Sequence, residues 1–581
     1  MPVRSRTPLR LLLLAAPAIL GACLSAPTDP TRLAAPTGLT VSQVTTTSVL
    51  ARWDSVPGAT GYIIQRAVGA NDFVPAYATS TLTRFTDTVT TGLVYLYRVR
   101  GVVGSDTTTA TNPVSTQTAI QRVVISSNIT ASRTLTSDTV YTIRGYVKVA
   151  NGATLTILPG TRIEGDFNVL GSSLWIQRGA RLVAEGTADR PIVFTSSQPV
   201  GQRRAGDWGG IVMVGNARVN RTENPLNTEG GAAGQAENYG GGTNDADNSG
   251  SLRYVRIEFA GFDIASGAGQ ELNGLSMYAL GNGTRIQYVQ TVTGLDDSFE
   301  WWGGTVDVAN LISYESGDDH FDWTEGWRGR AQFLIAFQTQ AIQPRPGAGI
   351  FATDPRGIEA DGCDPTVAGT TCVVNLTTTS APFSNPVIGN FTLVGTGDVS
   401  GFPNDGNGVV LRRGTAGTLI DGIIARFPGI GLDIRDAFTD SLRLRDSLNI
   451  ANILLAENGR NLPRTHYNGD GLDGPPTAEG SRRFAQAAKF AGQNHRTRDD
   501  AAALFTSLFA TGLDWTPANP SGVNARTGGS GGTGVVPARL ANRTANFPYN
   551  GGWQRTAYVG AGDPAGGAAR WWLPWSVYAI N

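Results

Sequence analysis

The sequence contains very little lysine, histidine and cysteine. Its 581 residues include only two lysines, Lys148 and Lys489, so arginine supplies almost all of the positive charge. Lys and Arg together number 46 against 47 Asp and Glu, and no basic tract is present, which excludes the pattern of a nucleic-acid-binding protein. The histidines are His320, His466 and His495. A serine–histidine–aspartate arrangement is therefore unsupported, and a histidine-based metal site would have to be built around His320.

Only one stretch is strongly apolar, and it lies at the N-terminus. Three arginines precede the run Leu11–Leu20, which is too short to span a bilayer as a helix. The run ends in Leu20-Gly21-Ala22-Cys23, which resembles the lipobox of bacterial lipoproteins. The resemblance implies a signal peptide over residues 1–22 and a lipid on Cys23; an ordinary secretory signal is the alternative. Because Leu24 rather than aspartate follows, the resemblance implies an outer-membrane anchor, facing the cell surface or the periplasm.

The other two cysteines form an even pair. Cys363 and Cys372 lie nine residues apart in a polar segment. In an oxidising compartment such a pair can staple a loop, whereas two cysteines alone make an incomplete metal site. We therefore expect a disulfide between them.

Glycine is abundant, with 74 residues beside 30 prolines, which is typical of an all-β protein with many turns. Residues 23–35 are expected to be a lipidated tether, followed over 36–119 by short alternating strands. The positions that carry the pattern are Trp53, Tyr62-x-Ile64-x-Arg66 and Tyr95-x-Tyr97-Arg98-Val99. This order resembles a fibronectin type III domain. The resemblance implies a β-sandwich that acts as a spacer or, alternatively, as an adhesion module.

A different pattern begins near residue 121. Two apolar residues at strand spacing are followed by a glycine and the next apolar residue, as in Leu155-x-Ile157-x-x-Gly160-x-x-Ile163. Such units are typical of a parallel β-solenoid, in which glycine permits the sharp corner. The segments LDDSFEWW (295–302) and GDDHFDWT (317–324) repeat one strand with a spacing of 22 residues. Residues 121–460 resemble right-handed parallel β-helix lipoproteins of Gram-negative envelopes, a largely uncharacterised group.

The last segment, 461–581, is expected to be a small mixed cap. Residues 481–510 are predicted to be helical, with a short amphipathic helix over 501–509. A solenoid has to cover its exposed end to prevent edge pairing, so the segment is expected to pack on the last coils. A second carbohydrate module is the alternative.

The doubled segment predicts a stack of carboxylates. If Phe299, Trp301 and their equivalents point into the solenoid, Glu300 lies one strand spacing, about 4.8 Å, from Asp322 on its outer face. Clustered carboxylates suit Ca²⁺, which binds six to eight oxygens. The predicted metal ligands are Asp296, Asp297, Asp318, Asp319 and Asp322. The segment 356–361 could line the same face, whereas 243–250 is either the start of a Ca²⁺ loop or a flexible acidic insertion.

Three functions fit this face. The first is binding of a glycan or an envelope protein, dependent on Ca²⁺ and with no other cofactor. The predicted binding residues are Trp302, with an exposed ring that stacks on a sugar, and His320, Glu325 and Arg328. The second is a polysaccharide lyase or glycoside hydrolase with Glu300 and Asp322 as its catalytic pair. The third is a purely structural scaffold at the cell surface.

Overall fold

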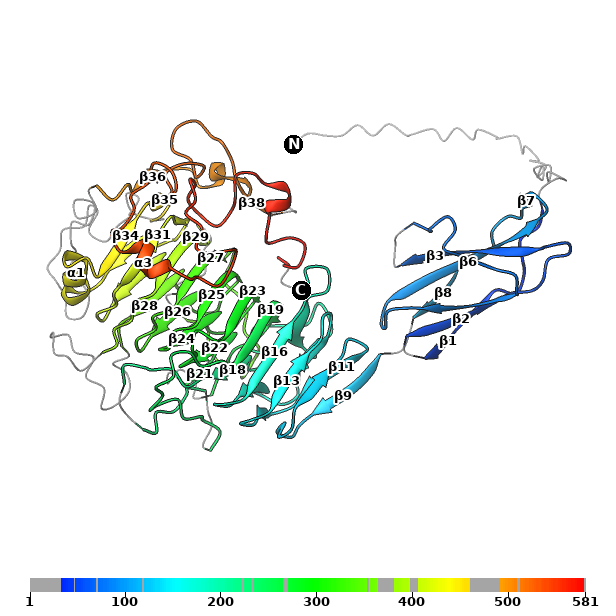
Figure 1. Ribbon diagram of the computed structural model, residues 1–581, viewed down its shortest axis with the longest axis horizontal. Coiled ribbons are helices and arrows are strands. Elements are labelled where there is room, and N and C mark those ends of the chain that lie inside the picture. The colour runs from blue at the N-terminus through cyan, green and yellow to red at the C-terminus, as the bar shows by residue number, and fades with distance from the viewer. Residues whose placement is uncertain are drawn as a thin grey trace, which may run out of the picture. The chain divides into compact units, whose positions relative to one another are not determined.

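The structure, a computed structural model, divides into two compact units, residues 1–119 and 120–581 (Figure 1). It describes residues 33–578 apart from 46, 69–71, 118–119, 222–223, 231–233, 265–269, 353–354, 364–380, 398–405, 460–491 and 509–512. The predictions made for the leader, Cys23, Cys372 and His466 lie outside the described residues. No helix among the described residues is long and apolar enough to cross a membrane.

The first unit is a β-sandwich of the fibronectin type III kind. One antiparallel sheet has the order β1-β2-β5 and the other β4-β3-β6-β7, with β8 paired to β6. The strands are β1 (Thr40–Thr45), β2 (Ser48–Arg52), β3 (Gly61–Val68), β4 (Ala78–Ser80), β5 (Arg84–Thr88), β6 (Val94–Val103), β7 (Asp106–Thr107) and β8 (Val114–Gln117). Alternate residues of β6 are buried, and Trp53 packs edge-on against Tyr62 with ring centroids 5.3 Å apart. The predicted sandwich is confirmed.

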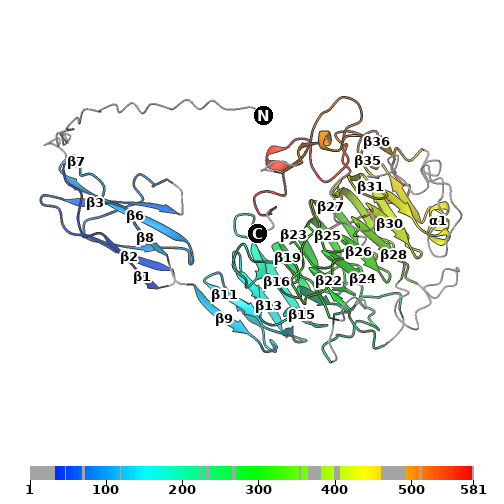
Figure 2. The same ribbon diagram turned by 180° about the vertical axis from the view of Figure 1, so that it is seen from behind.

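The second unit is a parallel β-helix, as predicted (Figures 1 and 2). Its smaller sheet has nine strands: β12 (Tyr146–Val149), β15 (Ser173–Ile176), β18 (Ile211–Val214), β22 (Leu275–Tyr278), β24 (Phe299–Trp302), β26 (Phe321–Thr324), β28 (Ile358–Asp361), β30 (Val409–Arg412) and β33 (Leu432–Ile434). These strands lie one above another, each from the next coil of the chain.

The larger sheet has 17 strands. They are β9 (Gln121–Ile125), β10 (Arg133–Leu135), β11 (Thr139–Ile143), β13 (Thr154–Ile157), β14 (Arg162–Gly165), β16 (Arg181–Glu185), β17 (Ile192–Ser196), β19 (Gly250–Glu258), β23 (Arg285–Val292), β25 (Asp307–Tyr314), β27 (Arg330–Phe337), β29 (Val387–Val394), β31 (Gly417–Ile420), β32 (Ile423–Ala425), β34 (Leu448–Ala451), β35 (Leu454–Ala456) and β36 (Arg496–Arg498). Two short antiparallel pairs lie outside the coils: β20 (Phe262–Asp263) with β21 (Glu271–Leu272), and β37 (Phe505–Ser507) with β38 (Asp514–Pro517).

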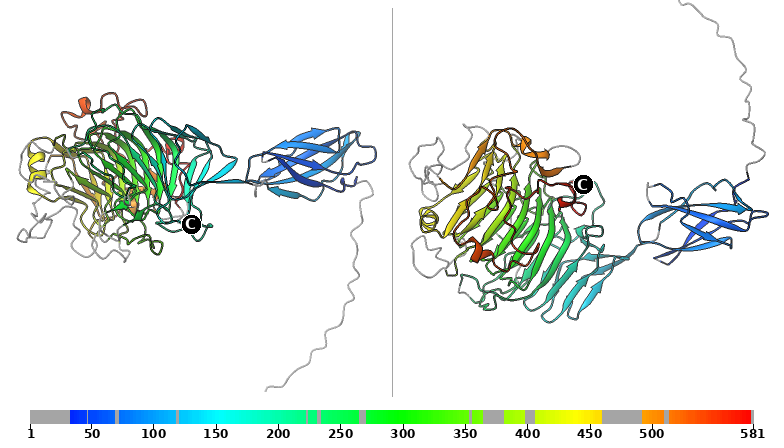
Figure 3. Two further views of the ribbon diagram at one scale, coloured as in Figure 1. Left: turned by 90° about the horizontal axis from the view of Figure 1, so that it is seen from below. Right: turned by 45° about the horizontal axis from the view of Figure 1, so that its top comes forward.

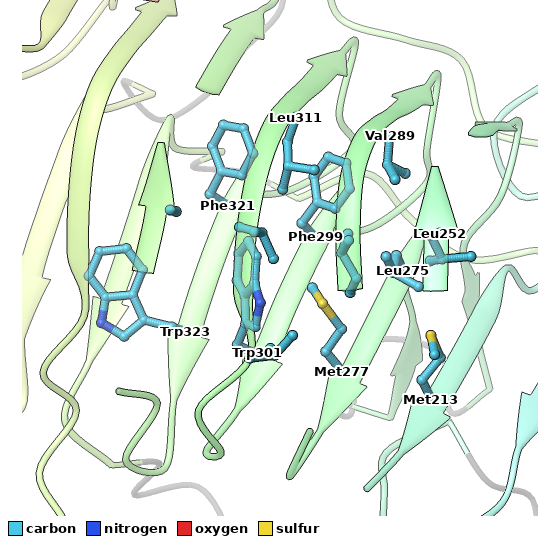
Figure 4. Packing of buried hydrophobic residues seen from close by; sticks show 14 of the residues in the cluster. Met213, Leu252, Leu275, Met277, Val289, Phe299, Trp301, Leu311, Phe321 and Trp323 are labelled. Carbon is cyan, nitrogen blue, oxygen red and sulfur yellow. The ribbon is translucent and has the colours of Figure 1, made fainter. Parts of the chain in front are cut away.

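The 22-residue repeat is confirmed by the strand register. In β24 and β26, Phe299 pairs with Phe321, and Trp301 with Trp323. These aromatic residues are buried in the interior of the coils, where the two phenylalanine rings stack with centroids 5.6 Å apart (Figure 4). Because side chains alternate along a strand, the residues between them point out of the solenoid.

The long strands of the larger sheet bend at one residue each. Asn310 in β25, Phe333 in β27 and Asn390 in β29 have positive φ angles of 56°, 63° and 53°. Asparagine tolerates this left-handed backbone better than most residues do. The Asn310 side-chain oxygen accepts a hydrogen bond from Gln287 at 3.0 Å, so neighbouring coils are also linked at this bend.

The C-terminal segment covers more of the solenoid than the last coils, where the sequence predicts a cap. Residues 514–578 lie along the outer face of the larger sheet, with contacts that extend from β34 and β35 to β19 and β23 (Figure 3). Val535 N–H donates to Asn452 at 2.7 Å, and Val577 N–H donates to Gln290 at 2.9 Å. The physical reason is that this outer face is apolar and needs covering: Val292, Ile312 and Ile335 lie in one buried cluster with Trp515, Trp572 and Trp575.

The helix predicted over 481–510 is wrong over the described residues 492–508; the rest of that range lies outside the described residues. Residues 502–504 form one 3-10 turn, and β37 follows directly. Before it, β36 pairs in parallel with β35, so coil strands extend past residue 460, where the solenoid was expected to end. The apolar run 501–509 has the pattern of a helix when it is considered alone. In the structure, Leu504 and Phe505 are buried in the cluster that covers the larger sheet. The described helices of this unit are α1 (Ala437–Leu444), α3 (Leu540–Thr544) and the 3-10 turns at 502–504 and 567–569.

Candidate functional site

One row of polar residues crosses the outside of the smaller sheet. The register of β22, β24, β26 and β28 aligns Ser276, Glu300, Asp322 and Glu359 on successive coils. The row points away from the core because its neighbours on each strand, such as Phe299 and Trp301, point inward. The predicted stacking of Glu300 on Asp322 is confirmed, and the segment 356–361 does line the same face.

A second set of carboxylates lies at the corner that precedes these strands. Asp297 accepts a hydrogen bond from the backbone N–H of Asp319 at 2.8 Å, and Asp319 accepts one from the N–H of Arg356 at 2.5 Å. Asn273 links this corner to the row, because its amide donates to Glu300 at 2.7 Å and its oxygen accepts from the N–H of Asp297 at 3.1 Å. Each coil thus holds the carboxylate of its neighbour in place.

Three groups of carboxylates are compact enough to share a metal ion. In each group the ligand atoms lie within 4.8 Å of one another. The groups are Asp296, Asp297 and Asp318; Asp297, Glu300 and Asp322; and Asp319, Asp322 and Glu359. Asp297 and Asp322 each belong to two groups, so the groups form a continuous line across three coils. We call these seven residues the acidic ladder. All five predicted metal ligands belong to it.

Arginines neutralise one end of the acidic ladder. Arg356 Nη1 lies 2.6 Å from Glu359 and 3.2 Å from Asp319. Arg412 Nη2 also lies 2.7 Å from Glu359, and its Nε lies 2.7 Å from Asp361. Towards the other end, Asp322 keeps an edge at the surface, while its Oδ1 is covered and has no hydrogen-bond partner among the described residues. A covered carboxylate oxygen without a donor is costly unless a cation or a proton satisfies it.

The electrostatics of the acidic ladder follow from this crowding. Burial raises the pKa of Asp297, and the charges of Asp319 and Asp296 raise it further. Burial also raises the pKa of Glu300, with Asp297 and Asp322 as the next causes, and the pKa of Asp322, with Glu359 and Asp361 next. The ladder therefore holds protons to a higher pH than isolated carboxyls do, and a cation that takes their place releases them.

The prediction that Trp302 has an exposed, sugar-binding ring is wrong. The side chain points out of the solenoid, but only 2% of the residue is exposed. It stacks on Tyr278, with ring centroids 3.9 Å apart and planes 11° apart. The insertion between β18 and β19, residues 215–249, covers both rings through its described residues Leu226 and Tyr239. Alternation along a strand predicts on which face a side chain lies. It does not predict whether a segment distant in the sequence covers that side chain.

Glu325 and Arg328, both predicted to bind ligand, instead hold the insertion. Glu325 is 1% exposed. Its carboxylate accepts a hydrogen bond from the Tyr239 hydroxyl at 2.6 Å and forms an ion pair with Arg221 at 2.7 Å. Arg328 pairs with Asp245 at 3.2 Å. Asp245 also bonds Arg218, so the segment 243–250 uses this aspartate for internal ion pairs. That contact argues against a Ca²⁺ loop there.

His320 is also buried, with 2% of its surface exposed. Its Nδ1 lies 2.6 Å from Ser313, which donates to Ser298 at 2.6 Å. Burial lowers the pKa of His320 to about 3, so the ring is neutral at physiological pH. The histidine lines a cavity of about 20 Å³ with Arg356 and Thr396, large enough for a single water molecule. It does not belong to any of the three carboxylate groups.

Two residues that act on the acidic ladder have no recognisable pattern in the sequence. Asn273 lies in a short turn before β22 and has no pattern of its own, although it bonds Glu300 and Asp297. Glu229 lies in the insertion, and its charge raises the pKa of Asp296 and Glu300 from a position far away in the sequence. Cys363 is 6% exposed, and its pairing with Cys372 stays a prediction because Cys372 is outside the described residues.

Comparison with known proteins gives one family and several similar sandwich domains. No curated protein matches the chain. A fibronectin type III-like protein from Clostridium thermocellum is 29% identical, with 15% of this chain and 92% of that structure covered and a TM-score of 0.14. The corresponding domain of human collagen alpha-1(XX) is 20% identical, covers 16% and 91%, and has a TM-score of 0.14. Titin kinase with its flanking domains is 17% identical over 16% of this chain, with a TM-score of 0.14, and the match spans only 22% of that structure.

The family match falls on the second unit. Residues 127–497 match the model described as a pectate-lyase-like β-helix domain. The match begins near β10 and ends within β36, so it includes every strand that carries the acidic ladder. It also covers more than half of the chain, and the chain therefore belongs to the family of pectate-lyase-like β-helix domains.

Proposed function

We propose that this chain is a surface lipoprotein whose β-helix binds a glycan together with Ca²⁺ at the acidic ladder. The observation that carries the proposal is the covered Oδ1 of Asp322, which has no donor among the described residues and lies in two of the three carboxylate groups. A carboxylate oxygen in that position is best satisfied by a cation. Membership of a pectate-lyase-like family supports a carbohydrate-related role at this level of detail.

The donor set suits a hard cation. Ca²⁺ takes six to eight oxygens at about 2.3–2.6 Å, and carboxylates are its preferred protein ligands. The central group consists of Asp297, Glu300 and Asp322. Arg356 and Arg412 pair with Asp319 and Glu359 at one end of the ladder, and among the described residues no ion pair reaches the central group. A cation held there keeps coordination positions for hydroxyl or carboxylate oxygens of a glycan.

The test is calorimetric titration of the full chain with Ca²⁺, followed by a polysaccharide panel with and without chelator. We expect Ca²⁺ binding, glycan retention only when Ca²⁺ is present, and loss of both in the double variant Asp297→Asn with Asp322→Asn. The matched control is Asp245→Asn, which changes an aspartate engaged by Arg218 and Arg328. Absence of Ca²⁺ binding by the unaltered chain, or equal loss in the control, contradicts the proposal.

A second candidate is cleavage of a polysaccharide by Glu300 and Asp322. It is favoured by their place on adjacent coils and by the raised pKa of both carboxyls, since a general acid has to hold a proton before it can donate one. The test is incubation with acidic and neutral polysaccharides, followed by assays for reducing ends and unsaturated products. Turnover that disappears in Glu300→Gln makes the chain an enzyme. No turnover, with Ca²⁺-dependent glycan binding retained, leaves the binding function.

A further inference from the structure

The insertion, residues 215–249, covers an aromatic part of the smaller sheet. Beneath it lie Trp175, Tyr278 and Trp302, which point out of the solenoid and are at most 2% exposed. Tyr239 of the insertion packs on Tyr278 with ring centroids 4.9 Å apart. The aromatic surface is therefore buried only as long as the insertion stays docked.

Polar contacts fix the insertion along its edges. On one side Arg221 and Tyr239 bind Glu325, at 2.7 and 2.6 Å. On the other, Glu237 pairs with Lys148 at 2.7 Å and accepts a hydrogen bond from Gln177 at 3.0 Å. A segment held at its edges by charged contacts responds to a change of charge in its neighbourhood more strongly than a packed core strand does.

One residue of the insertion, Glu229, contacts the strand next to the one that carries Glu300. The backbone N–H of Glu229 donates to the Tyr278 hydroxyl at 3.1 Å. Tyr278 pairs in register with Trp302, two residues beyond the paired Ser276 and Glu300. The negative charge of Glu229 is also one cause of the raised pKa of Asp296 and of Glu300. The docked insertion thus brings a further carboxylate up to a group of like charges.

We infer that cation binding at the acidic ladder and docking of the insertion over Trp302 are coupled through Glu229. The inference rests on the proposed cation site. Without a cation, the charges of Glu229 and the ladder repel each other, and the docked state is weakened. With a cation in the ladder, the repulsion becomes attraction, and the docked state is favoured. Because coupling between two equilibria is reciprocal, an undocked insertion also lowers the affinity for the cation.

Hydrogen exchange of the full chain, measured by mass spectrometry with Ca²⁺ and with chelator, tests this coupling. Peptides from 224–230 and 234–247 report on docking, because Tyr239 N–H bonds Leu226 O at 2.8 Å and Thr228 N–H bonds Glu237 O at 2.8 Å. We expect Ca²⁺ to slow exchange there about fivefold or more. Glu229→Gln, which keeps the shape and removes the charge, should slow exchange without Ca²⁺ and remove most of the Ca²⁺ response.

The control variant is Glu237→Gln, which loosens the other edge of the insertion. Its exchange should be faster with and without Ca²⁺, and its fold-response to Ca²⁺ should be unchanged. Two results separate the hypotheses. If calorimetry shows no Ca²⁺ binding, the cation site itself is absent. If Ca²⁺ binds while exchange in the insertion is unaffected, or if Glu229→Gln responds as the unaltered chain does, the cation site stands and the coupling is overturned.

Discussion

Trp302 shows how an outward-facing residue can serve the core of the protein. It follows Glu300 by two positions and therefore shares its side of β24. The insertion nevertheless covers it, and the stacking on Tyr278 gives the ring a packing role. A buried indole contributes to stability through apolar area and aromatic contact, whereas a sugar-stacking indole has to be open to solvent.

The substitution Trp302→Ala should therefore lower the free energy of unfolding by about 3–5 kcal/mol, the usual cost of truncating a buried aromatic residue. Denaturant unfolding followed by tryptophan fluorescence measures the change. Val200→Ala is the control, because Val200 is 70% exposed and its truncation should change stability by no more than about 0.5 kcal/mol. Unchanged stability together with lost glycan binding would instead make Trp302 a ligand-binding residue.

Glu315 is a buried carboxyl at a bend that follows β25. Its backbone has a positive φ of 58°, and the carboxyl accepts a hydrogen bond from the N–H of Thr339 at 3.2 Å. Burial raises its pKa to about 7 from the usual 4.5. The folded state therefore binds a proton that the unfolded state has already released between these two pH values.

Because the folded state holds the extra proton, stability should fall as the pH rises from 4.5 to 7, by about 3 kcal/mol at 1.36 kcal/mol per pH unit. Glu315→Gln should remove this part of the pH dependence, since the amide keeps the shape and an acceptor oxygen. Unfolding free energies of both proteins at about pH 4.5 and pH 8, with chelator present, give the difference. Equal pH slopes in the two proteins would contradict the assignment.

At the scale of the element, the acidic ladder is a consequence of parallel coils. Equivalent residues of β24, β26 and β28 meet at one strand spacing, so one acidic position per coil becomes a row of like charges. Such a row weakens the fold unless protons, arginines or a cation compensate for it. Arg356 and Arg412 do so at Glu359, and Glu300 and Asp322 keep raised pKa values.

The double variant Asp297→Asn with Asp322→Asn should therefore be more stable than the unaltered chain when Ca²⁺ is absent. We expect its thermal midpoint in chelator to rise by about 2 °C or more, because like charges are removed. The asparagine introduced in place of Asp297 still offers an acceptor oxygen to the N–H of Asp319. Added Ca²⁺ should raise the midpoint of the unaltered chain only. Differential scanning calorimetry measures both. A lower midpoint without Ca²⁺ would show that these carboxylates stabilise the fold by themselves.

The elements that the sequence predicts well are those whose signal is local. Phe299 and Trp301 repeat in Phe321 and Trp323, and alternation then places Glu300 and Asp322 on the other face. The elements that it does not predict depend on distant partners. The run 501–509 has the composition of a helix, but the apolar outer face of the larger sheet, built from residues 292–337 and beyond, decides its conformation.

At the site, too, the local repeat predicts some positions and distant partners decide the others. The rows of acids follow from the repeat, and all five predicted metal ligands lie in the ladder. The burial of Trp302 and the contacts of Glu325 depend on the insertion, which enters between β18 and β19 and has no repeat to place it. Asn273 is a single amide in a turn, so its two bonds to the ladder have no periodic pattern.

At the scale of the molecule, three features occupy separate parts of the described outer surface of the solenoid. The C-terminal segment lies over the larger sheet, the insertion lies over one part of the smaller sheet, and the acidic ladder occupies another part of it. The two compact units make a sandwich domain and a site-bearing solenoid. A sandwich between a tether and a solenoid serves best as a spacer if the chain is anchored at its N-terminus.

The N-terminal anchor can be tested directly. If Cys23 is lipidated, the mature chain should fractionate with membranes and incorporate labelled palmitate, because stable attachment needs more than one acyl chain and lipoproteins carry several. Cys23→Ala should abolish the label, while Cys363→Ala, the matched control, should keep it. Protease treatment of intact cells then distinguishes the cell surface from the periplasm. A Cys23→Ala protein that still incorporates the label would show that Cys23 is not the lipidated residue.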